Sequence, residues 1–443
     1  MTSSDTIYAV SSGGGKAGIA VIRMSGPLAG EVAAAMTGGL PAPRRAVVRK
    51  ISDPGTAEVL DRAVLLWLPG PRSVTGEDIV EFHVHGSAAV VSGLFAAFNS
   101  FRGLRPAEPG EFTRRAFANG RMDLVEAEGL ADLLNARTGR QRQQAVYHLM
   151  GRASSIYEEW RLRLVTILAR LEAAVDFVEE EGVAEAAIAN VRNDVVTLAS
   201  AMVSALETAG RTASIRNGIK VVLAGLPNTG KSSLLNALAK REAAIVSKHP
   251  GTTRDVIEVA VEIEGLEVIL TDTAGLREDS PDEIETIGIG RTHRELDEAD
   301  LVVWVSSPDV EGSGRLWDGV VPALRILNKM DLIGPGSELP GSPSVAISAR
   351  SGAGMPAMIA ELAKLIREKY GQADDPVIVR NRQKQAVMDS IRYLNESLLH
   401  DAPQLELAAE DLRKAAHSLA RITGRIDVED LLTAIFSEFC IGK

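Results

Sequence analysis

The sequence predicts a multidomain protein that combines α/β and all-helical parts. Its 443 residues exceed what a single hydrophobic core usually holds, so two or three domains are expected. Three different patterns follow one another along the chain: short β-like runs, a helical stretch without proline, and alternating strands and helices. A second helical stretch forms the tail.

Residues 1–119 are predicted to form a small α+β domain. The runs GIAVIRMSG, RAVLLWLPG and DIVEFHVHG are short, β-like and separated by glycine and proline turns, which is typical of strands. One alanine-rich helical stretch lies among them.

Residues 120–216 and 376–443 are predicted to be helical and to pack against each other. The tail is small for an independent core, yet it carries an apolar stripe that has to be buried. We therefore expect one discontinuous helical domain built from both ranges. The stripe expected in the first range is Leu164, Leu168, Leu171 and Val175. The stripe expected in the tail is Leu412, Ala416, Leu419 and Ile422.

Residues 217–375 would then be a domain inserted between the two helical ranges. Apolar runs such as IKVVLA, ADLVVWVSS and ALRILNK alternate with helical segments. This order predicts a mostly parallel sheet with helices on both faces.

A phosphate-binding loop follows the first strand of this inserted part. GLPNTGKSS matches G-x-x-x-x-G-K-[ST], comes after IKVVLA and opens a helix, which is the context such a loop requires. Lys231 would pair with the β- and γ-phosphates and Ser232 would hold Mg²⁺, while backbone N–H groups hold phosphate oxygens. The loop residues expected at the nucleotide are Asn228, Thr229, Gly230, Lys231, Ser232 and Ser233.

Two further motifs predict GTP rather than ATP. NKMD follows the strand ALRIL, and a carboxylate there accepts hydrogen bonds from the ring N–H and amino group of guanine. With adenine the same carboxylate would be left unpaired, which disfavours ATP. SAR follows the next strand. The residues expected at the base are Asn328, Lys329, Asp331, Ser348, Ala349 and Arg350.

PGTTRD and DTAG predict the parts that sense Mg²⁺ and the terminal phosphate. Thr253 would give Mg²⁺ a second hydroxyl, which is released when the γ-phosphate leaves. Asp272 would reach the ion through water, and the Gly275 N–H would face the γ-phosphate. Thr273 and Ala274 complete the DTAG motif.

The residue after DTAG poses a chemical problem. Leu276 stands where Ras-type enzymes carry the glutamine that orients the attacking water, and an apolar side chain cannot do this. Either Glu283 or Glu285, a few residues further on, could take over this task. Asn228 could help to hold a monovalent cation near the phosphates, where it would stabilise the transition state in place of an arginine finger.

Composition limits the cellular setting and the partners. The single cysteine, Cys440, excludes an internal disulfide and fits a reducing cytosol. Neither a leader pattern nor an apolar run of roughly 20 residues is found, so we expect a cytoplasmic protein without a membrane partner. The net charge of −11 implies that any nucleic acid is held by a local basic patch or by a partner.

These motifs together resemble the MnmE (TrmE) family of tRNA-modification GTPases. The likeness rests on GLPNTGKSSLLN, PGTTRD, DTAGLRE, IETIGIGRT, NKMD and the terminal FCIGK, and it runs from DTIYA to Lys443. It implies a folate-binding and dimerisation domain in residues 1–119 and a Ras-like GTPase domain in residues 217–375. It also implies a homodimer that forms a heterotetramer-type complex with the flavoprotein MnmG and acts on tRNA. We find no dinucleotide-binding motif, so the flavin would belong to that partner.

The resemblance further implies a potassium-activated GTPase. With MnmG it would form the 5-carboxymethylaminomethyl or aminomethyl group on the wobble uridine of certain tRNAs. The one-carbon unit would come from 5-formyl- or methylene-tetrahydrofolate, and GTP hydrolysis would open and close the dimer. Glu285 matches the water-orienting glutamate of the family. The potassium ligands that the resemblance implies are Asn228, Ser247, His249 and Thr252.

The folate site of the family matches residues at both ends of the chain. The implied folate contacts are Arg23, Glu81, Arg121 and Lys443. Cys440 has two interpretations: an apolar residue that closes the last helix, or a reactive group near the one-carbon unit. Two other functions remain open, a ribosome-assembly GTPase switch without modification chemistry and a folate enzyme whose GTPase is regulatory.

Overall fold

The computed structural model describes most of the chain. The described residues are 5–176, 183–241, 258–272, 295–317, 319–334, 343–371, 375–401 and 404–426, with Leu432, Ile435, Phe436, Phe439, Ile441 and Gly442. They divide into two compact units. The first unit comprises Met1–Ala131, His148–Val195 and Arg392–Lys443, and the second comprises Asp132–Tyr147 and Val196–Ile391.

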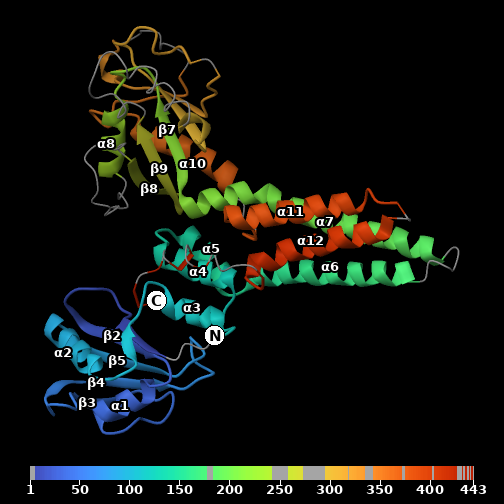
Figure 1. Ribbon diagram of the computed structural model, residues 1–443. Helices are drawn as coiled ribbons and strands as arrows, with labels where there is room; N and C mark the ends of the chain where they lie inside the picture. The colour runs from blue at the N-terminus through green and yellow to red at the C-terminus, as the bar shows by residue number, and fades with distance from the viewer. Residues whose placement is uncertain are drawn as a thin grey trace, which may run out of the picture. The chain divides into compact units, whose positions relative to one another are not determined.

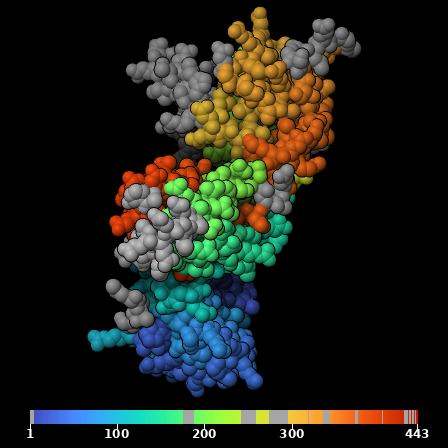
Figure 2. Space-filling model, turned by 90° about the vertical axis from the view of Figure 1, so that its right-hand side faces the viewer, coloured from blue at the N-terminus to red at the C-terminus, as the bar shows by residue number. Residues whose placement is uncertain are grey.

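The first unit contains a six-stranded sheet in the order β3-β4-β5-β2-β1-β6. Neighbouring strands are antiparallel except for β1 and β6, which are parallel. The space-filling view shows this sheet and its helices as a compact blue body (Figure 2). The strands are β1 (Thr6–Val10), β2 (Ala17–Ser25), β3 (Val47–Ser52), β4 (Val59–Leu68), β5 (Ile79–Gly86) and β6 (Leu104–Pro106).

The two faces of this sheet differ because side chains alternate along each strand. Ile22 and Met24 of β2 and Phe82 of β5 are fully buried beneath α1 (Ala29–Thr37) and α2 (Ala88–Asn99). Arg23 lies between Ile22 and Met24, and Glu81 precedes Phe82. Both side chains therefore lie on the opposite face of the sheet. This second face carries Arg23 and Glu81, two of the four residues that the resemblance assigns to folate.

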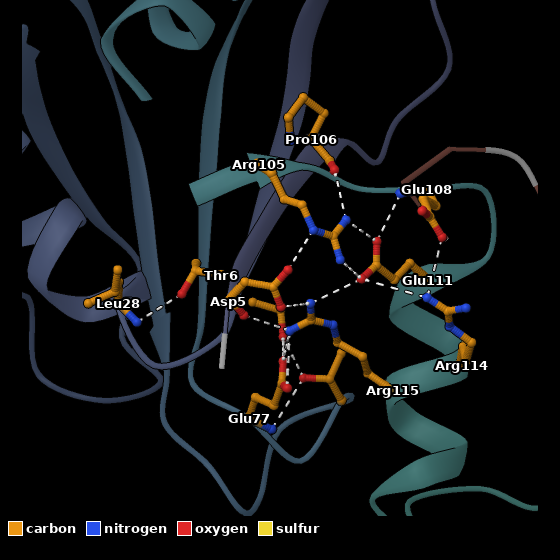
Figure 3. A network of polar contacts seen from close by, with 12 residues as sticks. Asp5, Thr6, Leu28, Glu77, Arg105, Pro106, Glu108, Glu111, Arg114 and Arg115 are labelled. Atoms are coloured by element: carbon orange, nitrogen blue, oxygen red, sulfur yellow. Dashed lines mark hydrogen bonds and ion pairs between the residues drawn. The ribbon is translucent and has the colours of Figure 1, made fainter. Parts of the chain in front are cut away.

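A network of charged side chains holds α3 (Glu111–Ala118) against the start of β1 (Figure 3). The Arg105 guanidinium donates to Asp5 at 2.5 Å and to Glu111 at 2.6 Å. Arg115 donates to Asp5 at 2.9 Å, to Glu111 at 3.0 Å and to Glu77 at 3.2 Å. Glu111 is only 2% exposed, and such a charge is tolerated when it is paired and hydrogen-bonded.

The helices of residues 124–217 and 381–423 belong partly to the first unit and partly to the second. α6 (Arg152–Asp176) and α12 (Leu405–Thr423), which are far apart in the sequence, pack along each other (Figure 1), and this confirms the predicted burial of the tail. None of the described helices has the length and hydrophobicity needed to cross a membrane. The helices are α4 (Leu124–Asn135), α5 (Gly139–Leu149), α6 (Arg152–Asp176), α7 (Val183–Asn217), α11 (Asn381–Ser397) and α12 (Leu405–Thr423).

The buried stripe of α6 differs from the predicted one. Leu164 and Leu171 are buried as expected, but Ile167 and Ala174 share their face while Leu168 is only half-buried. Spacings of three and four residues both keep a helical stripe in line, and the sequence offers apolar residues for either choice. In α12 the stripe holds for Leu412, Leu419 and Ile422, but Ala415 is buried and Ala416 is only half-buried.

The second unit is built on a sheet in the order β12-β11-β10-β7-β9-β8. All neighbouring pairs are parallel except β8 and β9, which confirms the predicted mostly parallel sheet. α8 (Lys231–Arg241) packs on β8 and β9, and α10 (Met355–Tyr370) packs on β11 and β12. The strands are β7 (Ile219–Ala224), β8 (Glu258–Ile263), β9 (Leu266–Asp272), β10 (Leu301–Ser306), β11 (Leu324–Leu327) and β12 (Val345–Ala346).

One carboxylate binds both segments that connect this sheet to the helices before and after it. Asp132 Oδ1 accepts a hydrogen bond from Arg216 Nε and another from Arg380 Nη2, each at 2.8 Å. Arg216 lies in the last turn of α7, just before β7, and Arg380 immediately precedes α11. The chain therefore enters and leaves the α/β part at one place, as the chain of an inserted domain does.

Candidate nucleotide-binding site

Four neighbouring strands bring the predicted nucleotide residues to one edge of the second unit's sheet. β7, β9, β10 and β11 are parallel, so their carboxyl ends lie at the same edge. The phosphate-binding loop follows β7, Asp272 ends β9, and Asn328 follows β11. In the ladder, Leu223 pairs with Asp272 and Ser306 pairs with Leu327, which keeps these strand ends level.

The phosphate-binding loop needs glycine at two positions. Gly225 has φ 147° and Gly230 has φ 87°, a region that other residues rarely adopt. A Cβ on Gly225 would lie 2.2 Å from the Val305 carbonyl oxygen, and one on Gly230 would lie 2.3 Å from Asn328 Nδ2. The loop thus packs directly on the ends of β10 and β11.

Lys231 and Ser232 stand at the start of α8, where the helix presents free backbone N–H groups. Lys231 is 3% exposed, and its ammonium group donates to the carbonyls of Gly225 at 3.0 Å and Leu226 at 3.1 Å. The positive charge is therefore held over the loop. This is the place where phosphate oxygens are expected.

The two described residues predicted to serve Mg²⁺ lie together. The Ser232 hydroxyl donates to Asp272 Oδ2 at 2.5 Å, and Asp272 is 1% exposed at the end of β9. A hydroxyl and a carboxylate oxygen at this distance fit the hard oxygen ligands that Mg²⁺ prefers, and a phosphate would supply further ones.

Asn328 connects the three motifs of the site. Its Nδ2 donates to the Thr229 carbonyl at 3.0 Å, and its Oδ1 accepts from the Ala349 N–H at 3.0 Å. Asn328 is 1% exposed, so both amide ends are committed to protein partners. NKMD, SAR and the phosphate-binding loop are thus brought into contact by Asn328.

Asp331 keeps an ionised, accessible carboxylate. It lies in the short 3₁₀ helix η2 (Met330–Leu332) and is exposed. A hydrogen bond with the Ser348 hydroxyl lowers the pKa of Asp331, and the positive charge of Arg350 adds to this effect. An ionised carboxylate can only accept, which suits the N–H and amino groups of guanine.

Sequence reasoning missed Asp309, which contacts NKMD. Asp309 follows β10, and its Oδ2 accepts a hydrogen bond from Lys329 Nζ at 2.7 Å. Lys329 also donates to the Asn228 carbonyl at 2.7 Å. The signal that could have found Asp309 is its place just beyond an apolar parallel strand, at the edge where the other site residues gather.

Several expected residues lie outside the part of the chain that the structure describes, and their roles stay predictions. They are Ser247, His249, Thr252, Thr253, Thr273, Ala274, Gly275, Glu283, Glu285, Cys440 and Lys443.

In the first unit, Arg23 and Glu81 form a tight pair on the polar face of the sheet. Arg23 Nε and Nη2 donate to Glu81 Oε1 at 2.9 and 2.8 Å. Burial alone would raise the pKa of Glu81, but the charge and hydrogen bonds of Arg23, with His83 at 3.2 Å, lower it. The Arg23 guanidinium also lies 5.9 Å from the ring centre of Phe112. Such an ionised carboxylate beside a guanidinium can bind both donors and acceptors of a ligand.

The end of the chain lies against this same domain. Gly442 accepts a hydrogen bond from the Ser11 hydroxyl at 2.8 Å, and Ile441 pairs with Pro109. Ser11 follows Val10 at the end of β1, whose neighbour in the ladder is Ile22. The described neighbours of Lys443 are thus near the strand that carries Arg23.

Arg121 is placed less clearly. It is exposed beyond α3, and its side-chain Cγ would lie 3.3 Å from a Cβ on Gly76. Among the described residues it forms neither a hydrogen bond nor an ion pair with Arg23 or Glu81. The structure therefore brings together Arg23 and Glu81 but does not join Arg121 to them.

Comparisons with known proteins decide the family. The model "MnmE helical domain" matches residues 124–440, and "GTP-binding protein TrmE N-terminus" matches residues 6–121. A Methylobacterium protein is 47% identical over 99% of this chain and 100% of its own length, and one from Parvibaculum lavamentivorans is 46% identical with the same coverage. A Rhodopseudomonas palustris protein is 43% identical over 100% of this chain and 99% of its own length. Each of the three is named tRNA modification GTPase MnmE.

The chain belongs to the MnmE family. Membership confirms the resemblance and the predicted fold class, an N-terminal α+β domain, a helical domain and a P-loop α/β domain. The G domain of the T. maritima FeoB iron transporter is 25% identical over 33% of this chain and 98% of its own length. Its TM-score of 0.22 supports no structural conclusion.

The close contact at Gly230 predicts that an alanine there reduces nucleotide binding. Gly230→Ala places a methyl group against Asn328 Nδ2 and forces the contact between the phosphate-binding loop and NKMD apart. We expect the affinity for GDP to fall at least about tenfold, or about 1.4 kcal/mol. A titration with fluorescent GDP measures this.

Gly319→Ala is the matched control for that variant. Gly319 also has a positive φ, 81°, but a Cβ there would meet nothing within 4 Å. Its GDP affinity should stay within about twofold of the parent's, because only backbone strain is added. Equal affinities for both variants would contradict the contact argument.

Proposed function

We propose that this chain is a potassium-activated GTPase that modifies the wobble uridine of certain tRNAs together with the flavoprotein MnmG. The product would be the 5-carboxymethylaminomethyl or aminomethyl group, with its carbon taken from 5-formyl- or methylene-tetrahydrofolate. The observation that carries the GTPase part is the meeting of Lys231, Asp272 and Asn328 at one edge of a parallel sheet. The family membership supports the tRNA-modifying part.

The described residues suit the binding of a guanine nucleotide. Lys231 and the N–H groups that begin α8 would hold the β- and γ-phosphates. Ser232 would hold Mg²⁺ directly and Asp272 through a water molecule, and the ion when bound neutralises phosphate charge. Asp331, kept ionised by Ser348, would accept from the N–H and amino groups of the base. Ala349, whose N–H donates to the Asn328 amide oxygen, and Arg350 would complete the base pocket.

Hydrolysis would depend on residues beyond the described part. Glu285 would orient the attacking water that Leu276 cannot, and Thr253 would give Mg²⁺ its second hydroxyl. The Gly275 N–H would face the γ-phosphate, and Thr273 and Ala274 would be nucleotide-binding residues of the same motif. We propose that two chains meet through their GTPase domains, and that a potassium ion then takes the place of an arginine finger. Its proposed ligands are Asn228, Ser247, His249 and Thr252.

The polar face of the first sheet is the proposed folate site. Tetrahydrofolate carries ring N–H donors and terminal carboxylates, so it needs acceptors and cations together. Glu81 and Arg23 offer one of each, 2.8 Å apart. Residues 441–442 lie beside the end of β1, which supports placing Lys443 and Cys440 near this pair. Arg121, a charged and exposed residue that follows α3 in the sequence, would also contact the folate.

The charge of the chain favours a shared grip on tRNA. A net charge of −11 opposes binding to phosphates, so the homodimer and MnmG would contribute much of the attraction. We place the complex in the cytoplasm. The division into domains at residues 119, 216 and 375 stays a prediction.

Potassium should accelerate hydrolysis in a way that sodium cannot. We expect GTP turnover at least about tenfold faster in potassium chloride than in sodium chloride of equal ionic strength, measured by phosphate release. Asn228→Ala should remove most of the difference, whereas Asn395→Ala, on an exposed part of α11, should keep it. Equal parent rates in the two salts would rule out the potassium site.

Mass spectrometry of tRNA nucleosides tests the modification role. A strain lacking this chain should lose the modified wobble uridine, and the parent chain should restore it. Lys231→Ala should fail to restore it, because the ammonium group over the phosphate-binding loop is gone. Unchanged wobble uridines in the deletion strain would reject the proposal and favour a ribosome-assembly switch.

A further inference from the structure

Asp309 and the phosphate-binding loop together hold the lysine of NKMD. Lys329 Nζ donates to Asp309 Oδ2 and to the Asn228 carbonyl oxygen, each at 2.7 Å. The ammonium group is thus bound from the end of β10 on one side and from the loop after β7 on the other. Lys329 itself has φ 58°, so both its backbone and its side-chain end are fixed.

The segment that carries Asp309 is held by its own hydrogen bonds. The Ser313 hydroxyl donates to the Ser307 carbonyl at 2.8 Å and accepts from the Ser307 N–H at 3.1 Å. Trp304 Nε1 donates to the Ser313 carbonyl at 2.9 Å, and the Ser307 hydroxyl donates to Asp309 Oδ1. Ser307 and Ser313 are only 2% and 3% exposed. The carboxylate therefore has a fixed place before any ligand binds.

The charge state of Asp309 fits this role. The hydrogen bond from Lys329, and then that from Ser307, lower the pKa of Asp309, so it is ionised at neutral pH. The side chains of Asp309 and Lys329 are 42% and 29% exposed, and exposed ion pairs add little to global stability. What the pair fixes is the position of a flexible four-carbon side chain.

We propose that Asp309 is a positioning residue of the guanine site. It holds the Lys329 side chain across the gap between β10 and the phosphate-binding loop, so that the lysine stem is ordered where the base binds. This inference rests on the proposed function, because it takes NKMD to be the guanine-binding motif.

The expected consequence is a loss of affinity for guanine nucleotides. Without the carboxylate, Lys329 keeps only the Asn228 carbonyl and gains rotamer freedom, which nucleotide binding must then remove. The loss should be about three- to fivefold in Kd, the range that exposed ion pairs support.

The test compares Asp309→Ala with Glu311→Ala in the full-length chain. Glu311 is an exposed acid two residues away, so the control removes the same charge from the same loop. Titration with fluorescent GDP should give a three- to fivefold higher Kd for Asp309→Ala and the parent value for Glu311→Ala. Parent affinity in Asp309→Ala, with an unchanged thermal melting curve, would overturn the inference. So would an equal loss in both variants, which would mean a general charge effect.

A double-mutant cycle separates positioning from a merely structural role. In a Lys329→Ala background, Asp309→Ala should cause no further loss, because there is no ammonium group left to hold. A further threefold loss there would show that Asp309 acts by another route and would overturn the inference.

ADP titrated into the parent distinguishes this inference from the proposed function. Equal binding of GDP and ADP would reject the guanine site itself, and with it this inference. Preserved GDP preference together with parent affinity in Asp309→Ala would reject the role of Asp309 alone.

Discussion

The parallel hydrogen-bond ladder of β7, β9, β10 and β11 is the constraint on which the nucleotide site depends. It places the phosphate-binding loop, Asp272, Asp309 and Asn328 at one edge, although they come from distant parts of the chain. The apolar runs of these strands are buried on both faces, so a slip in register would expose core residues and separate the site residues together. The positions of the site residues at this edge therefore depend on the packing of the strands.

In the N-terminal sheet, the alternation of side chains along each strand separates an apolar face from a polar face. Its one face is covered by α1 and α2, and its other face gathers charged residues that would be costly to bury alone. The network around Glu111 and Arg115 pairs charges at this end of the sheet and fixes α3 (Figure 3). Phe112 of α3 lies beneath the Arg23 guanidinium. The polar face can therefore keep an ionised carboxylate–guanidinium pair in place while part of it stays open to a ligand.

Much of this could be predicted from the sequence, because the decisive signals were local. The phosphate-binding loop, NKMD and SAR each combine a strand, a turn and a helix within a short stretch. The predicted stripe of α6 was partly wrong, since Ile167 replaces Leu168 on the buried face and only the partner helix decides between them. Asp309 and the bridge from Asp132 to Arg216 and Arg380 could not be predicted, because the partners of these single charged residues are far away in the sequence.

We propose above all that Asp331, at the edge of this sheet, binds the amino group of guanine. The measurement that tests it most directly is the ratio of Kd values for GTP and XTP in the parent and in Asp331→Asn. Xanthine carries a carbonyl where guanine carries the amino group, so it should be rejected by the carboxylate and accepted by the amide. The account predicts that the substitution inverts the preference from GTP to XTP. A variant that still binds GTP with parent affinity and still rejects XTP would contradict it.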